Sequence, residues 1–161
     1  MTPDRRPQGM GIIVKTVTRW LKGFILLYGV YLVLYGHLTP GGGFAGGVVI
    51  ASAFILLTLA GGAESGQRFF TVECASTLDG VGLLAFLLLA VLGAWWAGGY
   101  FFENFIETPE AQRFALFSGG IIPAANIALG LKVASSLFLV FAVLAGLRIA
   151  KRSDDREGDG S

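Results

Sequence analysis

The sequence is poor in the residues that most enzyme and metal sites require. Its 161 residues include one cysteine, Cys74, and one histidine, His37. A single cysteine excludes an internal disulfide and a cysteine-cluster metal site, and no basic neighbour in the sequence activates its thiol. A single histidine excludes paired-histidine metal sites and leaves little room for a histidine-based triad. We therefore expect no metal site, no cofactor and no catalytic residue in this chain.

Charged residues are also scarce. They make up 14% of the chain, whereas a soluble globular domain typically carries about 25%. The 12 Lys and Arg nearly balance the 11 Asp and Glu, so there is no broad basic surface for nucleic acid. Hydrophobic residues make up 54%, and the mean hydropathy is +0.69. This composition argues against a soluble enzyme and favours an integral membrane protein.

Long uncharged runs predict four membrane-spanning helices, because a spanning helix needs roughly 20 mostly apolar residues. No Asp, Glu, Lys or Arg lies between Lys22 and Glu64, and Pro40 with the glycines after it divides this run into two spans. The predicted spans lie near 18–38, 44–62, 80–99 and 126–149. We therefore predict an all-α integral membrane protein with a glycine-rich hairpin between its first two helices.

Basic residues gather near both ends of the chain. They are Arg5, Arg6, Lys15, Arg19 and Lys22 at the start, and Arg148, Lys151, Arg152 and Arg156 at the end. The positive-inside rule then predicts that both termini are cytoplasmic, which agrees with an even number of spans. Residues 1–152 are the predicted transmembrane domain, 153–161 a disordered polar tail, and 103–125 an interfacial or re-entrant segment. No small-x-small cleavage site follows the first span, so we expect it to be retained.

The glycine-rich stretch between the first two spans is the strongest local pattern. Gly43, Gly47 and Ala51 are spaced by four, so they share one face of the second span and form a surface for close helix packing. One interpretation is tight turning and packing alone. The other is that open backbone amides and His37 lie beside an ion or water path. His37 suits proton transfer because histidine titrates near neutral pH, although a lone histidine at a helix end often has a structural role.

Lys132 lies inside the fourth predicted span. A lysine at the centre of a membrane helix costs roughly 2.5–3.5 kcal/mol on insertion scales. Lys132 either extends to the interface or faces a polar interior with Ser135 and Ser136, which follow it at i+3 and i+4. Asn126 lies toward the start of the same span.

Two carboxylates lie near the third span. Asp79 is predicted to be the N-cap of this span, because Asp is a favoured cap. Glu73 is either a solvated loop residue or lines a cytoplasmic half-channel. Span parity places both carboxylates at the cytoplasmic end and Lys132 near the outer end. We therefore predict that any carboxylate partner of Lys132 lies on a different chain.

Two motifs resemble the B subunit of Mrp-type (Mnh) multisubunit Na⁺/H⁺ antiporters. The first runs from Gly36 to Gly47 with the sequence GHLTPGGGFAGG, and the second runs from Ile122 to Val133 with the sequence IPAANIALGLKV. The resemblance extends from about residue 18 to 150. Its motif residues here are His37, Pro40, Gly41, Gly42, Gly43, Phe44, Gly47, Asn126, Gly130 and Lys132.

The resemblance implies a small, non-catalytic subunit of a hetero-oligomeric cation/proton antiporter in the cell (inner) membrane. Its partners would be other antiporter subunits and the lipid bilayer, with Na⁺ and H⁺ as transported ions. The same subunit type recurs in the sodium-translocating modules of membrane-bound hydrogenases and related respiratory complexes. A purely structural assembly subunit is the third possibility. Candidate ion-path residues are His37, Glu73, Asp79, Asn126, Lys132, Ser135 and Ser136, and candidate packing residues are Pro40, Gly41, Gly42, Gly43, Phe44, Gly47, Ala51 and Gly130.

Overall fold

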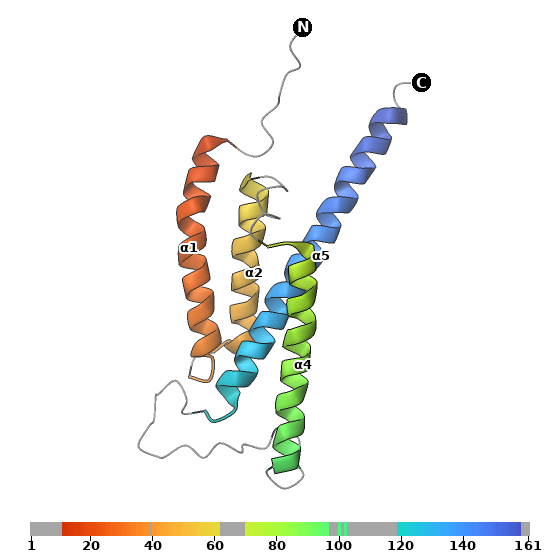
Figure 1. Ribbon diagram of the computed structural model, residues 1–161. Helices are drawn as coiled ribbons and strands as arrows, with labels where there is room; N and C mark the ends of the chain where they lie inside the picture. The colour runs from red at the N-terminus through yellow and green to blue at the C-terminus, as the bar shows by residue number, and fades with distance from the viewer. Residues whose placement is uncertain are drawn as a thin grey trace.

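The computed structural model describes residues 11–38, 40–61, 70–96, 100, 102 and 119–158, with side chains as far as residue 146. This part of the chain contains four long helices, α1 (Ile12–Leu34), α2 (Gly42–Gly61), α4 (Val72–Trp96) and α5 (Ile122–Gly158) (Figure 1). All four are long and apolar enough to cross a membrane, α5 through its Ile122–Gly146 part. The predicted all-α architecture with four membrane-length helices is confirmed.

The connection between α1 and α2 is a turn that requires glycine residues. Gly41 and Gly42 have φ angles of 133° and 61°, in the left-handed region that glycine enters at little cost. A methyl group on Gly36 would collide with the Cα atom of Gly42. The two ends of this turn therefore meet backbone to backbone, and α1 and α2 run side by side from it (Figure 1).

Small residues set the distance between α1 and α2. A Cβ atom on Gly29 of α1 would lie 2.7 Å from Cγ1 of Ile50, and one on Gly46 of α2 would lie 2.5 Å from Cγ2 of Val33. Neither position has space for a side chain. The two helices therefore cross at a glycine–glycine contact, the close approach that small residues permit between membrane helices.

Helix α5 lies at the centre of the molecule. It packs on α2 along one side and on α4 along another, while α1 packs mainly on α2 (Figure 1). A Cβ atom on Gly47 of α2 would lie 2.7 Å from the carbonyl oxygen of Gly130, and one on Gly82 of α4 would lie 2.9 Å from the backbone nitrogen of Lys132. The helices thus form a row in the order α1, α2, α5, α4, and α5 joins its two halves.

An aromatic cluster near the start of α4 packs α2 and α5 together. The ring of Phe70 stacks on Phe54 of α2 with centroids 4.8 Å apart and meets Phe138 of α5 edge-on at 4.9 Å. Phe138 is 2% exposed. Aromatic pairs of this geometry contribute about 0.5–1.5 kcal/mol more than the burial of their surface. Phe70 therefore ties α2 and α5 to the segment that enters α4.

Helix boundaries differ from the predicted spans. α4 begins at Val72 rather than near residue 80, because the Thr71 hydroxyl accepts a hydrogen bond from the backbone N–H of Cys74 at 3.2 Å and caps the helix there. α5 begins at Ile122, so residues 122–125 form its first turn, while residues 103–118 of the predicted interfacial segment lie outside the described residues. α5 also continues to Gly158, past residue 153 where the disordered tail is predicted to begin. Extending a helix that already exists costs far less than starting one.

The start of α1 and the end of α5 lie at the same end of the molecule (Figure 1). The glycine turn between α1 and α2 lies at the opposite end, together with the start of α5. We refer to these as the terminal end and the turn end. The side of the membrane that each one faces remains a prediction from the basic residues.

Candidate functional site inside the helix row

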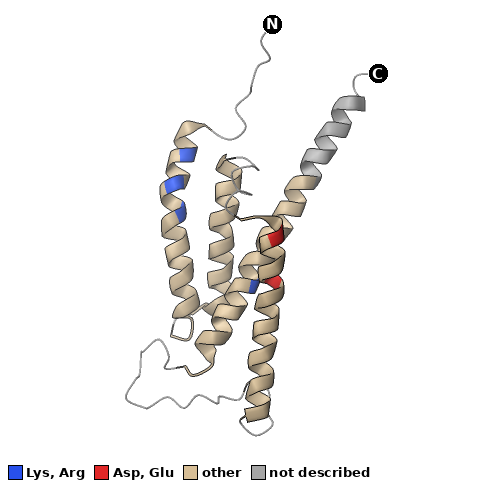
Figure 2. Cartoon of the chain, viewed as in Figure 1, with Lys and Arg blue, Asp and Glu red and all other residues tan. Residues whose placement is uncertain are grey.

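A lysine, an aspartate and a serine meet where α4 and α5 cross. The ammonium group of Lys132 donates hydrogen bonds to Oδ1 of Asp79 and to Oγ of Ser136, both at 3.0 Å. The Ser136 hydroxyl in turn donates to the same Asp79 oxygen. The side chains of Lys132 and Asp79 are 32% and 30% exposed. Figure 2 shows the blue residue of α5 beside the lower of the two red residues on α4.

Local sequence explains how the three side chains converge. Lys132 and Ser136 are separated by one helical turn, so they project from the same side of α5. Gly82 follows Asp79 by three residues and therefore lies on the same face of α4. The missing side chain at Gly82 lets α4 approach the backbone of α5 at Ala128 and Lys132, where a Cβ atom would lie 2.9–3.0 Å from backbone atoms.

The structure corrects two predictions about this site. Asp79 is not an N-cap, because α4 begins at Val72 and Asp79 lies well inside the helix. The carboxylate partner of Lys132 is in the same chain, not on a different one. Both errors have one cause. The prediction assumed that the third span begins only after the last charged residue, Asp79. The membrane-length helix α4 in fact begins at Val72 and includes Asp79.

Depth along α5 also differs from the prediction. Lys132 is 10 residues after Ile122, the first residue of α5, which corresponds to about 15 Å at 1.5 Å per residue. The hydrocarbon core of a bilayer is about 30 Å thick. If α5 crosses the bilayer from its first turn, Lys132 lies near the middle, and an ion pair with Asp79 replaces extension of its side chain to the interface.

Ser135 does not join the cluster. It is fully buried at 0% exposure, and its hydroxyl oxygen has no hydrogen-bond partner among the described residues. Other helical hydroxyls in this chain, such as those of Ser52 and Thr58, donate to the carbonyl four residues earlier. An unsatisfied buried polar atom costs about 1–3 kcal/mol, so Ser135 is an unusual residue next to the ion pair.

Asn126 connects the glycine turn to α5. Its Oδ1 atom accepts a hydrogen bond from the backbone N–H of Gly43 at 3.2 Å, while its buried Nδ2 atom has no hydrogen-bond partner in the described part of the chain. A Cβ atom on Gly36 would lie 2.9 Å from that Nδ2 atom. A methyl group on Gly43 would collide with the backbone of Asn126 itself. The glycines of the turn therefore surround this amide closely.

The predicted packing residues divide into two groups. Gly43, Gly47 and Ala51 are buried, and Gly47 packs against Gly130 across the α2–α5 contact. Phe44 is 60% exposed and Pro40 is exposed at the turn. The spacing of four thus identified one buried face of α2, whereas Phe44 projects outside it.

His37 and Glu73 lie on opposite sides of the ion pair. His37 is half-buried at the turn end, where a Cβ atom on Gly119 would lie 3.2 Å from its ring. Glu73 is exposed in the first turn of α4, toward the terminal end. Lys132 follows Asn126 by six residues and Asp79 follows Glu73 by six, each about 9 Å along a helix. Polar residues therefore occur at three successive levels along the helices, at Asn126, at the Lys132–Asp79 pair and at Glu73.

Two residues that shape the site were not identified from the sequence. Gly82 allows the close α4–α5 contact, and its spacing of three from Asp79 was the available signal. Thr71 caps α4, and the available signal was a Thr, a favoured N-cap residue, followed by the acidic Glu73 in the first turn.

Sequence comparison relates this chain to known proteins. Residues 13–139 match the family described as a domain related to the MnhB subunit of Na⁺/H⁺ antiporters. The Na⁺/H⁺ antiporter B subunit of Bacillus subtilis is 38% identical over 118 residues, which cover 68% of this chain and 81% of that protein. An uncharacterized protein of Methanocaldococcus jannaschii is 40% identical over 129 residues, which cover 78% of this chain. A putative antiporter subunit mnhB2 of Staphylococcus saprophyticus is 51% identical over 49 residues, which cover 30% of this chain.

The lengths of these relatives differ. The chain spans 48% of the length of the M. jannaschii protein and 35% of that of the S. saprophyticus protein. The family match nevertheless runs from the first turn of α1 to about the middle of α5, so it includes both motifs, Asp79 and Lys132. On that match, this chain, whose described residues form four membrane-length helices, belongs to the MnhB family.

Proposed function

We propose that this chain is a non-catalytic subunit of a multisubunit Na⁺/H⁺ antiporter in the cell membrane. We further propose that Lys132, Asp79 and Ser136 form an ion-binding cluster on its ion path. Membership of the MnhB family and the similarity to the B. subtilis antiporter protein support the first part. The 3.0 Å ion pair between two membrane-length helices supports the second part.

The ion pair is the observation that carries this proposal. Ionisable residues within membrane helices are costly and are usually retained for function. An ion pair between packed helices adds little net stability, because well-packed apolar residues of similar volume often serve as well or better. Packing alone therefore does not explain why α4 and α5 place an ammonium and a carboxylate within their membrane-length segments.

Charge balance suggests how this cluster couples the binding of Na⁺ to the release of H⁺. With Lys132 protonated and Asp79 ionised, the pair is neutral overall. A Na⁺ ion bound by the oxygens of Asp79 and Ser136 would add one positive charge in a poorly solvated place, which is unfavourable. Release of one proton from Lys132 restores neutrality. Entry of Na⁺ and departure of H⁺ are then linked at one site.

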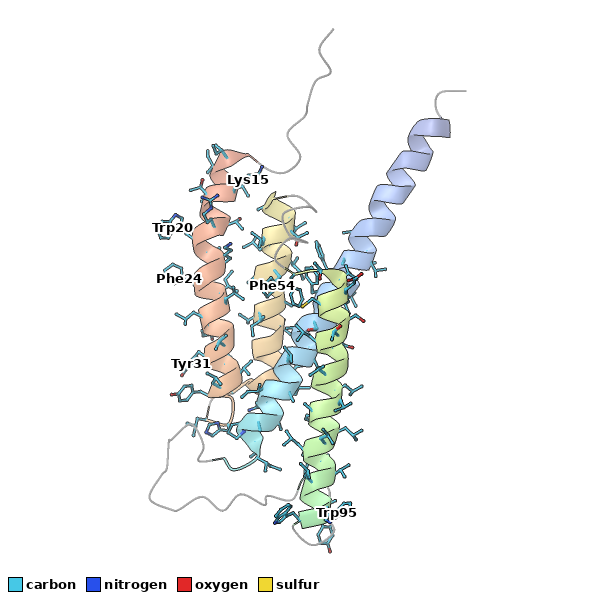
Figure 3. All side chains as sticks on the ribbon, in the orientation of Figure 1. Lys15, Trp20, Phe24, Tyr31, Phe54 and Trp95 are labelled. Atoms are coloured by element: carbon cyan, nitrogen blue, oxygen red, sulfur yellow. The ribbon has the colours of Figure 1, made fainter. Side chains whose placement is uncertain are left out.

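The outer surface of the row supports assembly with other subunits. Trp20, Phe24 and Tyr31 lie on the side of α1 that faces away from α2 (Figure 3). Trp20 and Phe24 are 73% and 68% exposed. Large exposed apolar faces of this kind fit a chain that packs among partner helices and lipid. The partners we propose are the other subunits of the antiporter.

The proposal is tested by removing each charge in the complete complex. We expect Lys132→Met and Asp79→Asn each to lower Na⁺/H⁺ antiport at least tenfold in everted vesicles. Thr77→Ala is the matched control on α4, because its exposed hydroxyl donates only to the carbonyl of Glu73. Blue-native electrophoresis reports assembly in the same membranes.

Normal antiport in an assembled Lys132→Met complex would refute a direct role and favour a purely structural role. Mass spectrometry of the purified particle checks the first part of the proposal. Antiporter-type subunits are the expected partners. Iron–sulfur or nickel–iron subunits would instead place the chain in a redox-driven complex.

A further inference from the structure

The ion pair between α4 and α5 is only partly covered by this chain. The side chains of Lys132 and Asp79 are 32% and 30% exposed, although both residues lie within membrane-length helices. Figure 2 shows them side by side where α4 and α5 cross. The pair therefore presents a polar surface at a level where its surroundings are lipid, water or another protein.

Both members of the pair keep unused hydrogen-bonding capacity. The two hydrogen bonds to Asp79, from Lys132 and from Ser136, end on the same oxygen, Oδ1, so Oδ2 accepts none from the described residues. An ammonium group has three N–H donors. Lys132 directs two of them to Asp79 and Ser136, and the third meets no acceptor in the part of the chain that the structure describes. One acceptor and one donor are thus available to an additional group.

Apolar side chains flank this polar surface. Leu83 follows Asp79 by four residues and Val140 follows Ser136 by four, so each projects from the same side of its helix as the polar residue before it. They are 55% and 57% exposed. Water fits such an apolar border poorly, and acyl chains cannot satisfy the polar centre. A polar centre with an apolar border suits a second membrane helix, since membrane helices hydrogen-bond to one another through polar side chains.

Charge balance defines the chemistry of the covering group. Lys132 and Asp79 neutralise each other, so a third charged side chain would leave a net charge in a poorly solvated place. The covering group is therefore neutral and both donates and accepts. The side chain of Asn or Gln carries an acceptor oxygen and a donor NH₂ in one planar group. It can accept from Nζ of Lys132 and donate to Oδ2 of Asp79 at once.

We propose that a transmembrane helix of another subunit packs over the crossing of α4 and α5 and places a side-chain amide against Lys132 and Asp79. The ion-binding cluster is then completed only in the assembled complex. This inference rests on the proposed function, because it needs a multisubunit complex. The surface it uses is separate from the aromatic face of α1, which lies at the other end of the helix row.

Site-specific photo-crosslinking in the complete complex tests this assignment. The photoreactive residue p-benzoylphenylalanine replaces Leu83 or Val140, one at a time, and crosslinked peptides are identified by mass spectrometry. We expect both positions to crosslink to the same transmembrane segment of one other subunit, and that segment to contain Asn or Gln. Leu88 is the matched control. It is 51% exposed and follows Asp79 by about two and a half turns, so it projects from the opposite side of α4 and should not reach that segment.

A substitution in the partner tests the amide itself. Leu in place of the partner's Asn or Gln should lower the crosslinking yield from both positions at least threefold, because the pair then loses its acceptor and its donor. Lys132→Met with Asp79→Leu removes the polar groups from this chain and should restore the yield with the Leu-bearing partner. If the probes at positions 83 and 140 prevent assembly while the probe at 88 does not, the same surface is again identified as the contact.

Several outcomes would overturn the inference. Crosslinks only to lipid, or no crosslinked product from either position, in a complex of normal subunit composition would show that lipid or water covers the pair. A common partner segment without Asn or Gln would refute the amide. These results would leave the proposed function standing. A chain that purifies without any other subunit would overturn both.

Discussion

Nζ of Lys132 and Oδ1 of Asp79 lie 3.0 Å apart although 53 residues separate them in the chain. The contact joins the first third of α4 to the middle of the membrane-length part of α5. Removing one member leaves the other charge uncompensated in a poorly solvated place, whereas removing both leaves no charge to solvate.

This asymmetry predicts the outcome of a double-mutant cycle. We expect Asp79→Asn to lower the thermal midpoint of the purified complex, since a lysine without its counter-ion inside a membrane-length helix is costly. Asp79→Asn combined with Lys132→Met should restore much of that loss without restoring antiport. A double variant that is less stable than both single variants would show that the pair is not coupled in this way.

A glycine pair within α4 tests the close contact that positions the ion pair. Gly82→Leu should separate α4 from α5 and strongly reduce assembled complex, because its Cβ atom would lie 2.9 Å from the backbone nitrogen of Lys132. Gly80→Ala is the control, since its Cβ atom would meet nothing within 4 Å. Alanine in place of a helical glycine favours the helix by up to about 1 kcal/mol. Blue-native electrophoresis and thermal midpoints report both effects, and equal behaviour of the two variants would contradict the packing role.

The contact between α2 and α5 is tested in the same manner. Gly47→Leu should abolish assembly, because even its Cβ atom would lie 2.7 Å from the carbonyl oxygen of Gly130. Gly23→Ala on α1 is the control, since nothing lies within 4 Å of that position. The measurement is the yield of full-size complex after gentle detergent extraction. A normal yield from Gly47→Leu would mean that α2 and α5 can separate without consequence.

The amide of Asn126 gives a local prediction. Asn126→Leu removes the acceptor for the Gly43 N–H and should destabilise the turn end by about 1–3 kcal/mol. Hydrogen exchange at the first turn of α2 should accelerate accordingly. Ser52→Ala serves as the control, because the exposed Ser52 hydroxyl donates only to the carbonyl of Val48 in its own helix. Unchanged exchange near Gly43 in Asn126→Leu would show that this hydrogen bond does not hold the turn.

The sequence predicted the four helices because hydropathy and length alone determine which segments can cross a bilayer. It also placed Lys132 and Ser136 on one side of their helix, since that follows from helical periodicity. It grouped Ser135 with them, but Ser135 lies fully buried and its hydroxyl makes no hydrogen bond with the pair. Ser136 joins the pair and Ser135 does not because of the way α4 crosses α5. Helical periodicity carries no information about that crossing.

The position of Asp79 illustrates a second limit. Runs of uncharged residues predict where a span begins only if charges stay outside the membrane. α4 breaks that assumption by carrying Asp79 inside, because Lys132 of another helix compensates it. The sequence alone does not show that Asp79 and Lys132 pair. That follows from the close contact between α4 and α5 at Gly82.

The central place of α5 makes it a mechanical link. One end of its membrane-length part holds Gly43 through Asn126, and its middle holds Asp79 through Lys132. Glycines supply close backbone contacts to both of its neighbours, and Phe138 packs against Phe70 beside the start of α4. A shear of α5 along its own axis would alter both polar contacts in one movement. Strain applied at the glycine turn would thus reach the charged pair through α5.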